Sequence, residues 1–207
     1  CLLELLMFSK INFAPISVII PCFNCHDTID MAINSVLKQT LKPYQIIMIN
    51  DGSSDTYKTK NKLMFLKSKI NSIYKQINVE IIELKMNKGP SFVRNLGWEK
   101  ASEEFIAFLD ADDFWHPEKI KLQFKWMNKN TEFKITGHQT SSKKLNFYNK
   151  KKLNLTGKKV TIKQLIFFNY FQTSSVMIKK DVYPRFNKNI RFGEDYNLWL
   201  RLSNKIN

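Results

Sequence analysis

The sequence predicts an α/β protein built around an open, mostly parallel sheet with helices on its faces. Two observations carry this prediction. Over the first 130 residues, short runs rich in Ile, Val and Phe alternate with longer helical patterns, as expected for parallel strands that are buried on both faces. The predicted strands start at residues 16, 45, 79 and 105, which are 29, 34 and 26 residues apart. These separations are close to the length of a strand–helix–strand unit.

The elements follow one another in a regular order. Each predicted strand is a short apolar run that ends at polar residues, and the four runs are Ile16–Ile20, Gln45–Ile49, Val79–Leu84 and Phe105–Leu109. Helices are predicted after them, near residues 28–39, 54–73, 90–101 and 117–128. Pro117 would occupy the first position of the last helix, where its missing N–H costs nothing.

The regular alternation ends after about residue 130. Residues 133–140 and 173–178 are predicted strands, residues 161–169 a short helix, and residues 141–160 an irregular stretch rich in Lys. A final helix is predicted to begin near Asp195, with one apolar stripe made of Leu198, Trp199 and Leu202. No linker rich in Gly, Pro or Ser divides the chain, so we expect a single domain over residues 7–207.

The composition excludes several classes of protein. The chain has 207 residues, of which 43% are apolar and 25% charged, so it is not a disordered tail, a collagen-like repeat or a disulfide-stapled miniprotein. No apolar run approaches the roughly 18 residues of a membrane span, and the opening residues 1–8 are too short for a signal peptide. We therefore expect a cytoplasmic protein, with residues 1–6 upstream of a natural start at Met7.

The charge is strongly positive and unevenly distributed. There are 33 Lys and Arg residues against 18 Asp and Glu residues, which gives a net charge of +15. Only four of the cations are Arg, the residue preferred for bidentate contacts with phosphates and bases, so no nucleic-acid partner is expected. Residues 133–180 contain eleven Lys and no acid. This segment is either a solvated face or a contact with an anionic membrane, which would hold the protein at the inner face of the cytoplasmic membrane.

The two cysteines Cys22 and Cys25 match the Cys-x-x-Cys spacing of redox proteins and, together with His26, the pattern of haem attachment. A redox role would leave the acidic motifs of the chain without a task. Two cysteines without a second pair do not predict a structural zinc site either. We interpret them as two small residues in a strand-to-helix loop.

Polar clusters follow each of the four predicted strands, at residues 21–24, 50–55, 87–89 and 110–113. In a parallel sheet these clusters share the carboxyl edge, where open α/β folds bind their ligands. The last cluster holds three carboxylates in four residues, which would repel one another without a cation. Mg²⁺ is typically held by one or two carboxylates together with substrate phosphates. The cluster therefore predicts a metal that holds a diphosphate, and an acidic turn in which Asp113 caps the next helix is the alternative.

Other polar and aromatic residues have both a functional and a structural interpretation. Asp51 would accept hydrogen bonds from a ribose or a base, or form an Asx turn that caps the helix near residue 54. Asp195 follows Glu194 at the start of the last helix, where acids interact favourably with the helix dipole. It could be a general base only if the fold brings it to the carboxyl edge of the sheet. His138 could line the pocket, but we expect it to be a structural histidine.

An aromatic stripe precedes the last predicted strand and consists of Phe167, Phe168, Tyr170 and Phe171. We expect these rings to lie in the core. Contact with an acceptor or a membrane is the alternative.

Five motifs, in this order, resemble glycosyltransferase family 2, the inverting enzymes of the GT-A fold. They lie at residues 17–24, 49–55, 87–97, 108–115 and 193–201. The resemblance covers residues 16–130 closely and residues 173–203 loosely. It implies a GT-A-type open sheet, with a nucleotide-sugar-binding half at residues 7–130 and an irregular acceptor-side half at residues 131–207.

The resemblance also implies a nucleotide-sugar donor, with UDP as the expected nucleotide. Pro21 and Phe23 would flank the base, with Asn24 in the same donor-binding motif. Asp51 would form a hydrogen bond with the base. Arg94 would reach the nucleotide or brace its loop.

The remaining site residues are implied in the same way. Asp110 would sit near the ribose, and Asp112 would ligate Mn²⁺ or Mg²⁺ against the diphosphate. Asp195 would be the catalytic base, which takes a proton from the acceptor hydroxyl as that oxygen attacks the anomeric carbon.

The expected function is a metal-dependent, inverting sugar transfer to a hydroxyl of a bacterial surface glycan such as lipopolysaccharide or capsule, with a glycan or lipid-linked glycan as acceptor. An inactive or truncated nucleotide-sugar-binding module is one alternative, because the chain stops twelve residues after Asp195 whereas family members generally continue with further helices. A nucleotidyltransferase is another, although its usual Gly-rich opening loop is missing.

Overall fold

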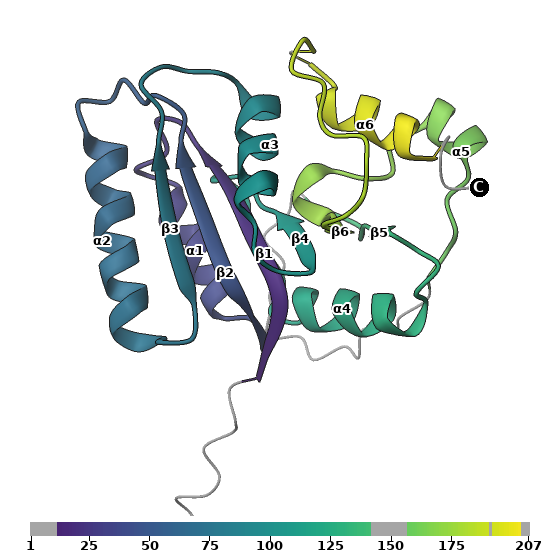
Figure 1. Ribbon diagram of the computed structural model, residues 1–207, viewed down its shortest axis with the longest axis horizontal. Helices are drawn as coiled ribbons and strands as arrows, with labels where there is room; N and C mark the ends of the chain where they lie inside the picture. The colour runs from purple at the N-terminus through teal and green to yellow at the C-terminus, as the bar shows by residue number, and fades with distance from the viewer. Residues whose placement is uncertain (1–11, 142–156, 191, 204–207) are drawn as a thin grey trace, which may run out of the picture.

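The structure of the protein is a computed structural model that describes residues 12–141, 157–190 and 192–203. Its centre is a sheet in the order β3-β2-β1-β4-β6-β5 (Figure 1). Strands β1 to β4 run parallel, whereas β6 pairs antiparallel with both β4 and β5. The prediction of an open, mostly parallel sheet is therefore confirmed. The strands are β1 (Asn12–Cys22), β2 (Leu41–Asn50), β3 (Asn78–Glu83), β4 (Phe105–Phe108), β5 (Ile135–Thr136) and β6 (Met177–Lys179).

Helices cover both faces of this sheet. The helical elements are α1 (Ile29–Leu37), α2 (Lys58–Ile73), α3 (Pro90–Lys100), α4 (Lys119–Lys129), α5 (Ile162–Phe167), the short 3₁₀ turn η2 (Thr173–Ser175) and α6 (Glu194–Ser203). Side chains of α1, α2 and α4 share one core with Ile16, Val18 and Ile20 of β1. Side chains of α3 and α6 share the other core with Ile19. Alternate residues of β1 thus point into opposite cores, as in a strand buried on both faces.

No helix within the described ranges is both long enough and apolar enough to cross a membrane.

The register of the parallel strands brings their carboxyl ends to one edge. Cys22 at the end of β1 pairs with Asn50 at the end of β2, and Asn50 pairs in turn with Glu83 at the end of β3. On the other side of β1, Ile19 pairs with Phe108 at the end of β4. The polar clusters that follow these strands are therefore neighbours in space, as the sequence predicts.

Two helices begin later than predicted. Helix α2 begins at Lys58 rather than at residue 54, because Thr56 and Tyr57 have positive φ angles of 52° and 67° and cannot be part of a helix. Helix α4 begins at Lys119, so the prediction of Pro117 at its first position is wrong. The carbonyl of Pro117 instead accepts a hydrogen bond of 2.8 Å from the N–H of Thr40, which fixes Pro117 in the turn before the helix.

The second half differs more from its prediction. Strand β5 covers two residues of the expected range 133–140, and residues 173–175 form the 3₁₀ turn η2 instead of the start of a strand. The reason for η2 is local, because the N–H groups of Ser175 and Val176 donate to carbonyls three residues earlier. The predictions for residues 1–6 and for most of 141–160 lie outside the described residues.

The expectation that the aromatic stripe lies in the core is wrong for three of its rings. Phe167, Phe168 and Tyr170 are exposed, and Phe171 is only partly buried, against the second core. Helix α5 has six residues and buries only Leu165. The helix therefore packs through one side chain, which leaves its other faces, including Phe167, exposed.

Candidate active site

A cleft of about 430 Å³ lies at the carboxyl edge of the sheet, where the loops after β1, β2, β3 and β4 meet. Six residues predicted to bind a donor line it, namely Pro21, Phe23, Asn24, Asp51, Asp110 and Asp112. Arg94 and Asp195 do not line it. Phe23 lines the cleft and is 47% exposed, so its ring is accessible to a planar group there.

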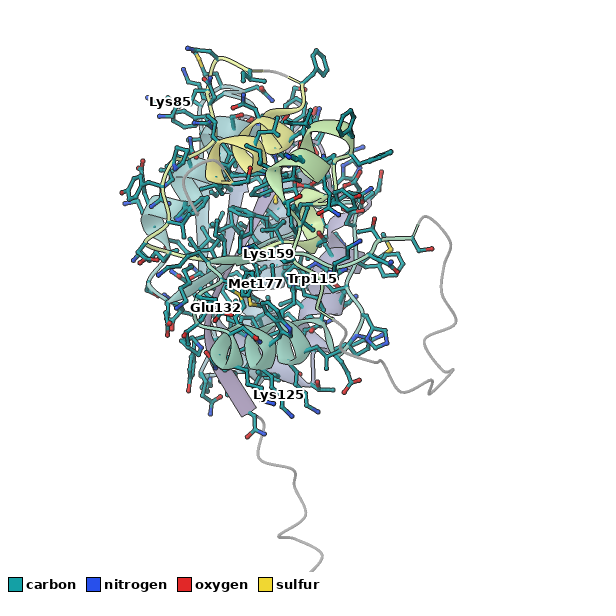
Figure 2. All side chains as sticks on the ribbon, turned by 90° about the vertical axis from the view of Figure 1, so that its right-hand side faces the viewer. Lys85, Trp115, Lys125, Glu132, Lys159 and Met177 are labelled. Atoms are coloured by element: carbon teal, nitrogen blue, oxygen red, sulfur yellow. The ribbon has the colours of Figure 1, made fainter. Side chains whose placement is uncertain are left out.

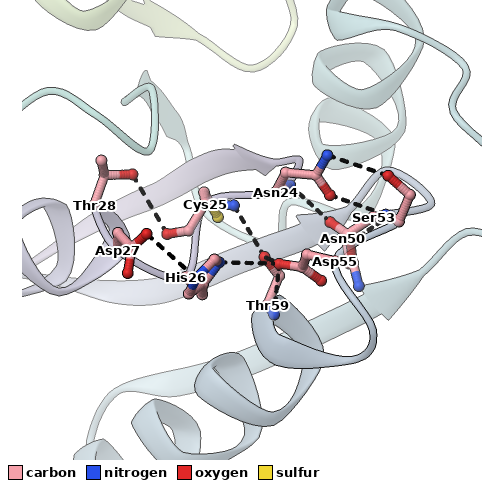
Figure 3. A network of polar contacts seen from close by, with 10 residues as sticks. Asn24, Cys25, His26, Asp27, Thr28, Asn50, Ser53, Asp55 and Thr59 are labelled. Carbon is pink, nitrogen blue, oxygen red and sulfur yellow. Dashed lines mark hydrogen bonds and ion pairs between the residues drawn. The ribbon is translucent and has the colours of Figure 1, made fainter.

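Asn24 connects the first two loops of the cleft (Figure 3). Its side-chain oxygen accepts a hydrogen bond of 2.9 Å from the N–H of Ser54, and its own N–H donates to the hydroxyl of Ser53 at 2.9 Å. Asn24 has a φ of 47°, a left-handed conformation that Asn tolerates better than most residues. The residue therefore shapes the cleft, a task that its sequence motif alone does not reveal.

Asp55 holds the start of α2 against the β1–α1 turn (Figure 3). One carboxylate oxygen accepts from the N–H of Thr59 at 2.9 Å and from its hydroxyl at 2.5 Å. Nδ1 of His26 lies 3.2 Å from the same oxygen. Burial alone would raise the pKa of Asp55, but the hydrogen bonds from Thr59 and His26 lower it. Asp55, and not Asp51, is thus the acid that caps α2.

Asp51 braces the loop that precedes α3. Its carboxylate is buried and accepts hydrogen bonds from the N–H groups of Lys88 at 2.7 Å and Gly89 at 2.9 Å. The same loop packs tightly on Gly52, where a Cβ would lie 2.5 Å from the carbonyl carbon of Met86. Each carboxylate oxygen has more than one lone pair, so Asp51 can brace this loop and still accept a hydrogen bond from a molecule in the cleft.

Arg94 joins the two halves of the protein beneath the cleft. This buried side chain donates to Asp110 after β4 and to Glu194 at the start of α6, both at 2.8 Å. Burial alone would lower the pKa of Arg94, but the two carboxylates raise it. The resemblance implies that Arg94 either reaches the nucleotide or braces its own loop, and this geometry corresponds to the second role.

The turn η2 touches both acidic motifs. Ser174 accepts a hydrogen bond of 3.0 Å from the N–H of Asp110 through its hydroxyl, and one of 2.7 Å from Nε1 of Trp115 through its carbonyl. The hydroxyl of Thr173 donates to Asp195 at 3.1 Å. Sequence reasoning missed both residues, because it interpreted them as part of a strand. The one available signal was the run of three hydroxyl residues before β6.

Asp112 is exposed at the cleft, in an acidic loop. Within the described residues, no Lys, Arg or His forms an ion pair with Asp112. The described part of the chain also contains no group of three or more His, Cys, Asp or Glu side chains that could hold a metal ion. Burial raises the pKa of the neighbouring Asp113, a hydrogen bond with Ser174 opposes this, and the charges of Asp110 and Asp112 raise the pKa further. The loop therefore carries negative charge that the described residues neutralise only at Asp110.

Asp195 lies in the first turn of α6 and is partly exposed. One carboxylate oxygen accepts from its neighbour's N–H at 2.6 Å and the other from the hydroxyl of Thr173. The preceding residue, Glu194, pairs with Arg94 and so with the loop of Asp110. Through Glu194 the start of α6 is thus tied to the loop after β4 at the carboxyl edge of the sheet, whereas Asp195 itself does not line the cleft.

Comparison with known proteins agrees with this arrangement. The family model described as "Glycosyl transferase family 2" matches residues 17–193. An uncharacterised glycosyltransferase of Rickettsia felis is 33% identical over 92% of this chain, and the aligned part is 30% of that protein. The Escherichia coli protein named UDP-Glc:alpha-D-GlcNAc-diphosphoundecaprenol beta-1,3-glucosyltransferase WfgD is 29% identical over 90% of this chain and 69% of its own length. The chain spans about a third of the length of its rickettsial relatives.

Solved structures share the fold. S. aureus TarS superposes with a TM-score of 0.63 at 20% identity, over 88% of this chain and 53% of the TarS chain. The mannosyltransferase PcManGT from Pyrobaculum calidifontis, solved with GDP-Man and Mn²⁺, superposes with a TM-score of 0.63 at 14% identity, over 90% of this chain and 53% of its own.

Proposed function

Because this chain belongs to glycosyltransferase family 2, we propose that it transfers a sugar from a nucleoside-diphosphate donor to a hydroxyl group of a bacterial surface glycan. The observation that carries the proposal is the single cleft lined by Phe23, Asp51, Asp110 and Asp112. An aromatic ring, buried acceptors and an exposed carboxylate are the groups that a base, a ribose and a metal-bound diphosphate require.

A uridine nucleotide is the proposed donor carrier. The name of WfgD states that it uses UDP-Glc, and TarS, whose likeness is one of fold, has been solved with UDP. In the proposed complex the nucleotide base lies between Pro21 and Phe23. An N–H group of this base donates a hydrogen bond to a free lone pair of the Asp51 carboxylate. Asp110, held in place by Arg94 and Ser174, is left to contact the ribose.

Asp112 is the residue that would hold a divalent cation. The acidic loop fits such an ion, because its charge is in excess and Asp112 forms no ion pair with any described cationic side chain. One or two carboxylates are the usual protein share of a Mg²⁺ site that also contains phosphates. When bound, Mn²⁺ or Mg²⁺ would stabilise the charge that develops on the departing diphosphate.

Asp195 is the proposed general base. It would accept the proton of the acceptor hydroxyl as that oxygen attacks the anomeric carbon in line with the leaving group, which inverts the configuration at that carbon. The hydrogen bond from Thr173 fixes the orientation of the carboxylate and leaves further lone pairs on both oxygens. A correctly placed base contributes about 10²–10⁴-fold to the rate.

The proposed acceptor is a sugar on a lipid carrier of the kind used to build lipopolysaccharide, capsule or a related surface polymer. Relatives support this class of acceptor. The name of WfgD includes a diphosphoundecaprenol-linked sugar, and that of an Erwinia amylovora relative, 26% identical over 89% of this chain, assigns it to amylovoran biosynthesis.

Release of UDP is the assay that tests this function. The protein is incubated with a panel of UDP-sugars, a short-chain polyprenyl-diphosphate sugar as acceptor and Mn²⁺ or Mg²⁺. We expect UDP release that requires both the acceptor and the metal, and that chelation abolishes. If the protein binds UDP in a metal-dependent manner but releases none from any donor, it is an inactive sugar-nucleotide binder and the proposed transfer is wrong.

A further inference from the structure

Four large side chains at the end of α5 and directly after it are exposed. We call them the α5 patch, which consists of Ile166, Phe167, Phe168 and Tyr170. Phe167 is 77% exposed and Phe168 is 65% exposed, and the ring of Phe168 lies 6.2 Å from that of Tyr170. Soluble proteins rarely expose contiguous apolar surface of this kind unless it contacts a partner or a membrane.

Three exposed lysines lie in the segment that carries this patch. Lys158 and Lys159 precede α5 and Lys163 lies within it, and all three are exposed. Figure 2 views this side of the molecule, with Lys159 drawn between α4 and α6. No Asp or Glu occurs anywhere in residues 133–180. The segment that carries the patch therefore combines exposed rings with lysines and contains no acid, the combination that binds to anionic lipid surfaces.

The α5 patch is held firmly against the helix that carries Asp195. A capping box between Thr161 and Gln164 fixes the start of α5. At its end, the hydroxyl of Tyr196 donates to the carbonyls of Leu165 and Ile166. Since Tyr196 directly follows Asp195, the position of the patch and that of the proposed base are set by the same turn of α6.

A second lysine-rich surface provides a comparison. Helix α2 exposes Met64 and Phe65 among five lysines and has no acid. It packs beside β3, at the opposite edge of the sheet from β5 and β6 (Figure 1). A membrane bound there would lie far from α6. Helix α2 therefore shares the lysines and exposed apolar side chains of the α5 patch but not its proximity to Asp195, which makes α2 the matched control.

We propose that the α5 patch binds the surface of an anionic bilayer, with Phe167 and Phe168 in the headgroup region and the three lysines on the lipid phosphates. Bound in this way, α6 would present Asp195 towards a sugar whose lipid carrier lies in the same bilayer. The inference depends on the proposed lipid-linked acceptor, but vesicle binding is measured without donor, metal or acceptor, so either proposal can fail alone.

The test is sedimentation with vesicles of phosphatidylcholine, with and without phosphatidylglycerol. We expect binding that requires phosphatidylglycerol and weakens as salt is added. The double variant Phe167→Ser/Phe168→Ser should bind at least about tenfold more weakly, because each ring loses apolar contact. Each of Lys158→Gln, Lys159→Gln and Lys163→Gln should cost about fivefold, the equivalent of roughly 1 kcal/mol per lysine.

Matched changes on α2 serve as controls. Met64→Ser/Phe65→Ser and the triple change of Lys60, Lys67 and Lys69 to Gln should leave vesicle binding unchanged. All variants should keep the wild-type thermal midpoint and the wild-type turnover of a water-soluble acceptor. The inference is wrong if the unaltered protein does not bind anionic vesicles, if the α2 changes weaken binding as much as the α5 changes, or if the α5 changes leave vesicle binding unaltered.

Discussion

The two halves of the protein position their functional residues by different means. In residues 12–130, parallel strands in register bring Pro21, Asp51 and Asp110 to one edge of the sheet. In residues 157–203, individual side chains position the proposed base, since Thr173 donates to Asp195 and Glu194 pairs with Arg94. The proposed donor cleft thus follows from the architecture of the sheet, whereas the placement of Asp195 depends on a few contacts. Changes in the second half should therefore separate catalysis from donor binding.

The largest difference between the effect on turnover and the effect on UDP binding is expected for Asp195→Asn. Removal of the base should lower turnover about 10²–10⁴-fold, or about 3–5 kcal/mol of barrier. The amide is nearly isosteric, so UDP binding should stay within about twofold of wild type. Turnover and UDP affinity, measured on the same preparation, check this prediction. A parallel loss of both would mean that the two halves do not act separately.

Arg94→Met tests the junction itself. The variant leaves Glu194 and Asp110 without their cation, and breaking a buried ion pair typically costs 3–5 kcal/mol. Because Asp110 is partly exposed, with 32% of its side chain accessible, we expect about 3 kcal/mol and a thermal midpoint lower by roughly 6–12 °C. Arg94→Lys keeps the positive charge but cannot donate to both carboxylates as the guanidinium does, so its thermal midpoint should lie between those of wild type and Arg94→Met. A melting curve of Arg94→Met identical to that of wild type would contradict the claim that Arg94 stabilises the contact between the two halves.

Mild acid should destabilise the fold through His138, which lies just after β5. Burial, and then the charge of Lys119, lowers the pKa of His138 from 6.5 to about 4. The unfolded chain therefore binds this proton at a higher pH than the folded protein does, so stability is lost as the pH falls from about 6.5 towards 4. Between pH 7 and pH 5 this amounts to about 2 kcal/mol.

Comparison of melting curves for wild type and His138→Leu at these two pH values measures that contribution. The wild type should lose roughly 4–8 °C more than the variant. Equal losses would show that His138 does not differ between the folded and unfolded states.

The smallest effect is expected for Thr173→Val. This change keeps the shape of the side chain but removes the donor to Asp195, which is worth about 1 kcal/mol. Turnover should fall by up to about tenfold while UDP binding stays unchanged. Ser53→Ala, which removes an acceptor from the first half, is the matched control and should alter UDP binding more than the chemical step. The reverse pattern would invert the assignment of the two halves.

The sequence predicts which residues meet at the cleft, because the cleft is formed by strand ends. An apolar run followed by a polar cluster is visible without knowledge of the fold, and the parallel sheet then brings those clusters together. The bracing roles of Asn24 and Asp51 could not be predicted in this way. Each contacts a loop about 30 or more residues away, so the partner is known only once the loops are placed.

The second half is harder to predict for a related physical reason. Thr173 and Ser174 act through a tight 3₁₀ turn, and a stretch of Thr, Ser and Val followed by apolar residues favours a strand just as well. Phe167 and Phe168 appeared to be core residues because of their composition. Their exposure depends on the length of α5 and on where Tyr196 anchors it.

The measurement that tests the central claim most directly is the thermal midpoint with UDP, with and without Mn²⁺, for wild type, Asp112→Ala and Asp195→Asn. A ligand at 100 times its Kd adds about 2.7 kcal/mol, which corresponds to roughly 5–11 °C for a domain of this size. We predict a rise of this order that needs both nucleotide and metal, persists in Asp195→Asn and vanishes in Asp112→Ala. No rise with any nucleoside diphosphate, or a rise that Asp195→Asn abolishes, would contradict the assignment of donor binding to the first half.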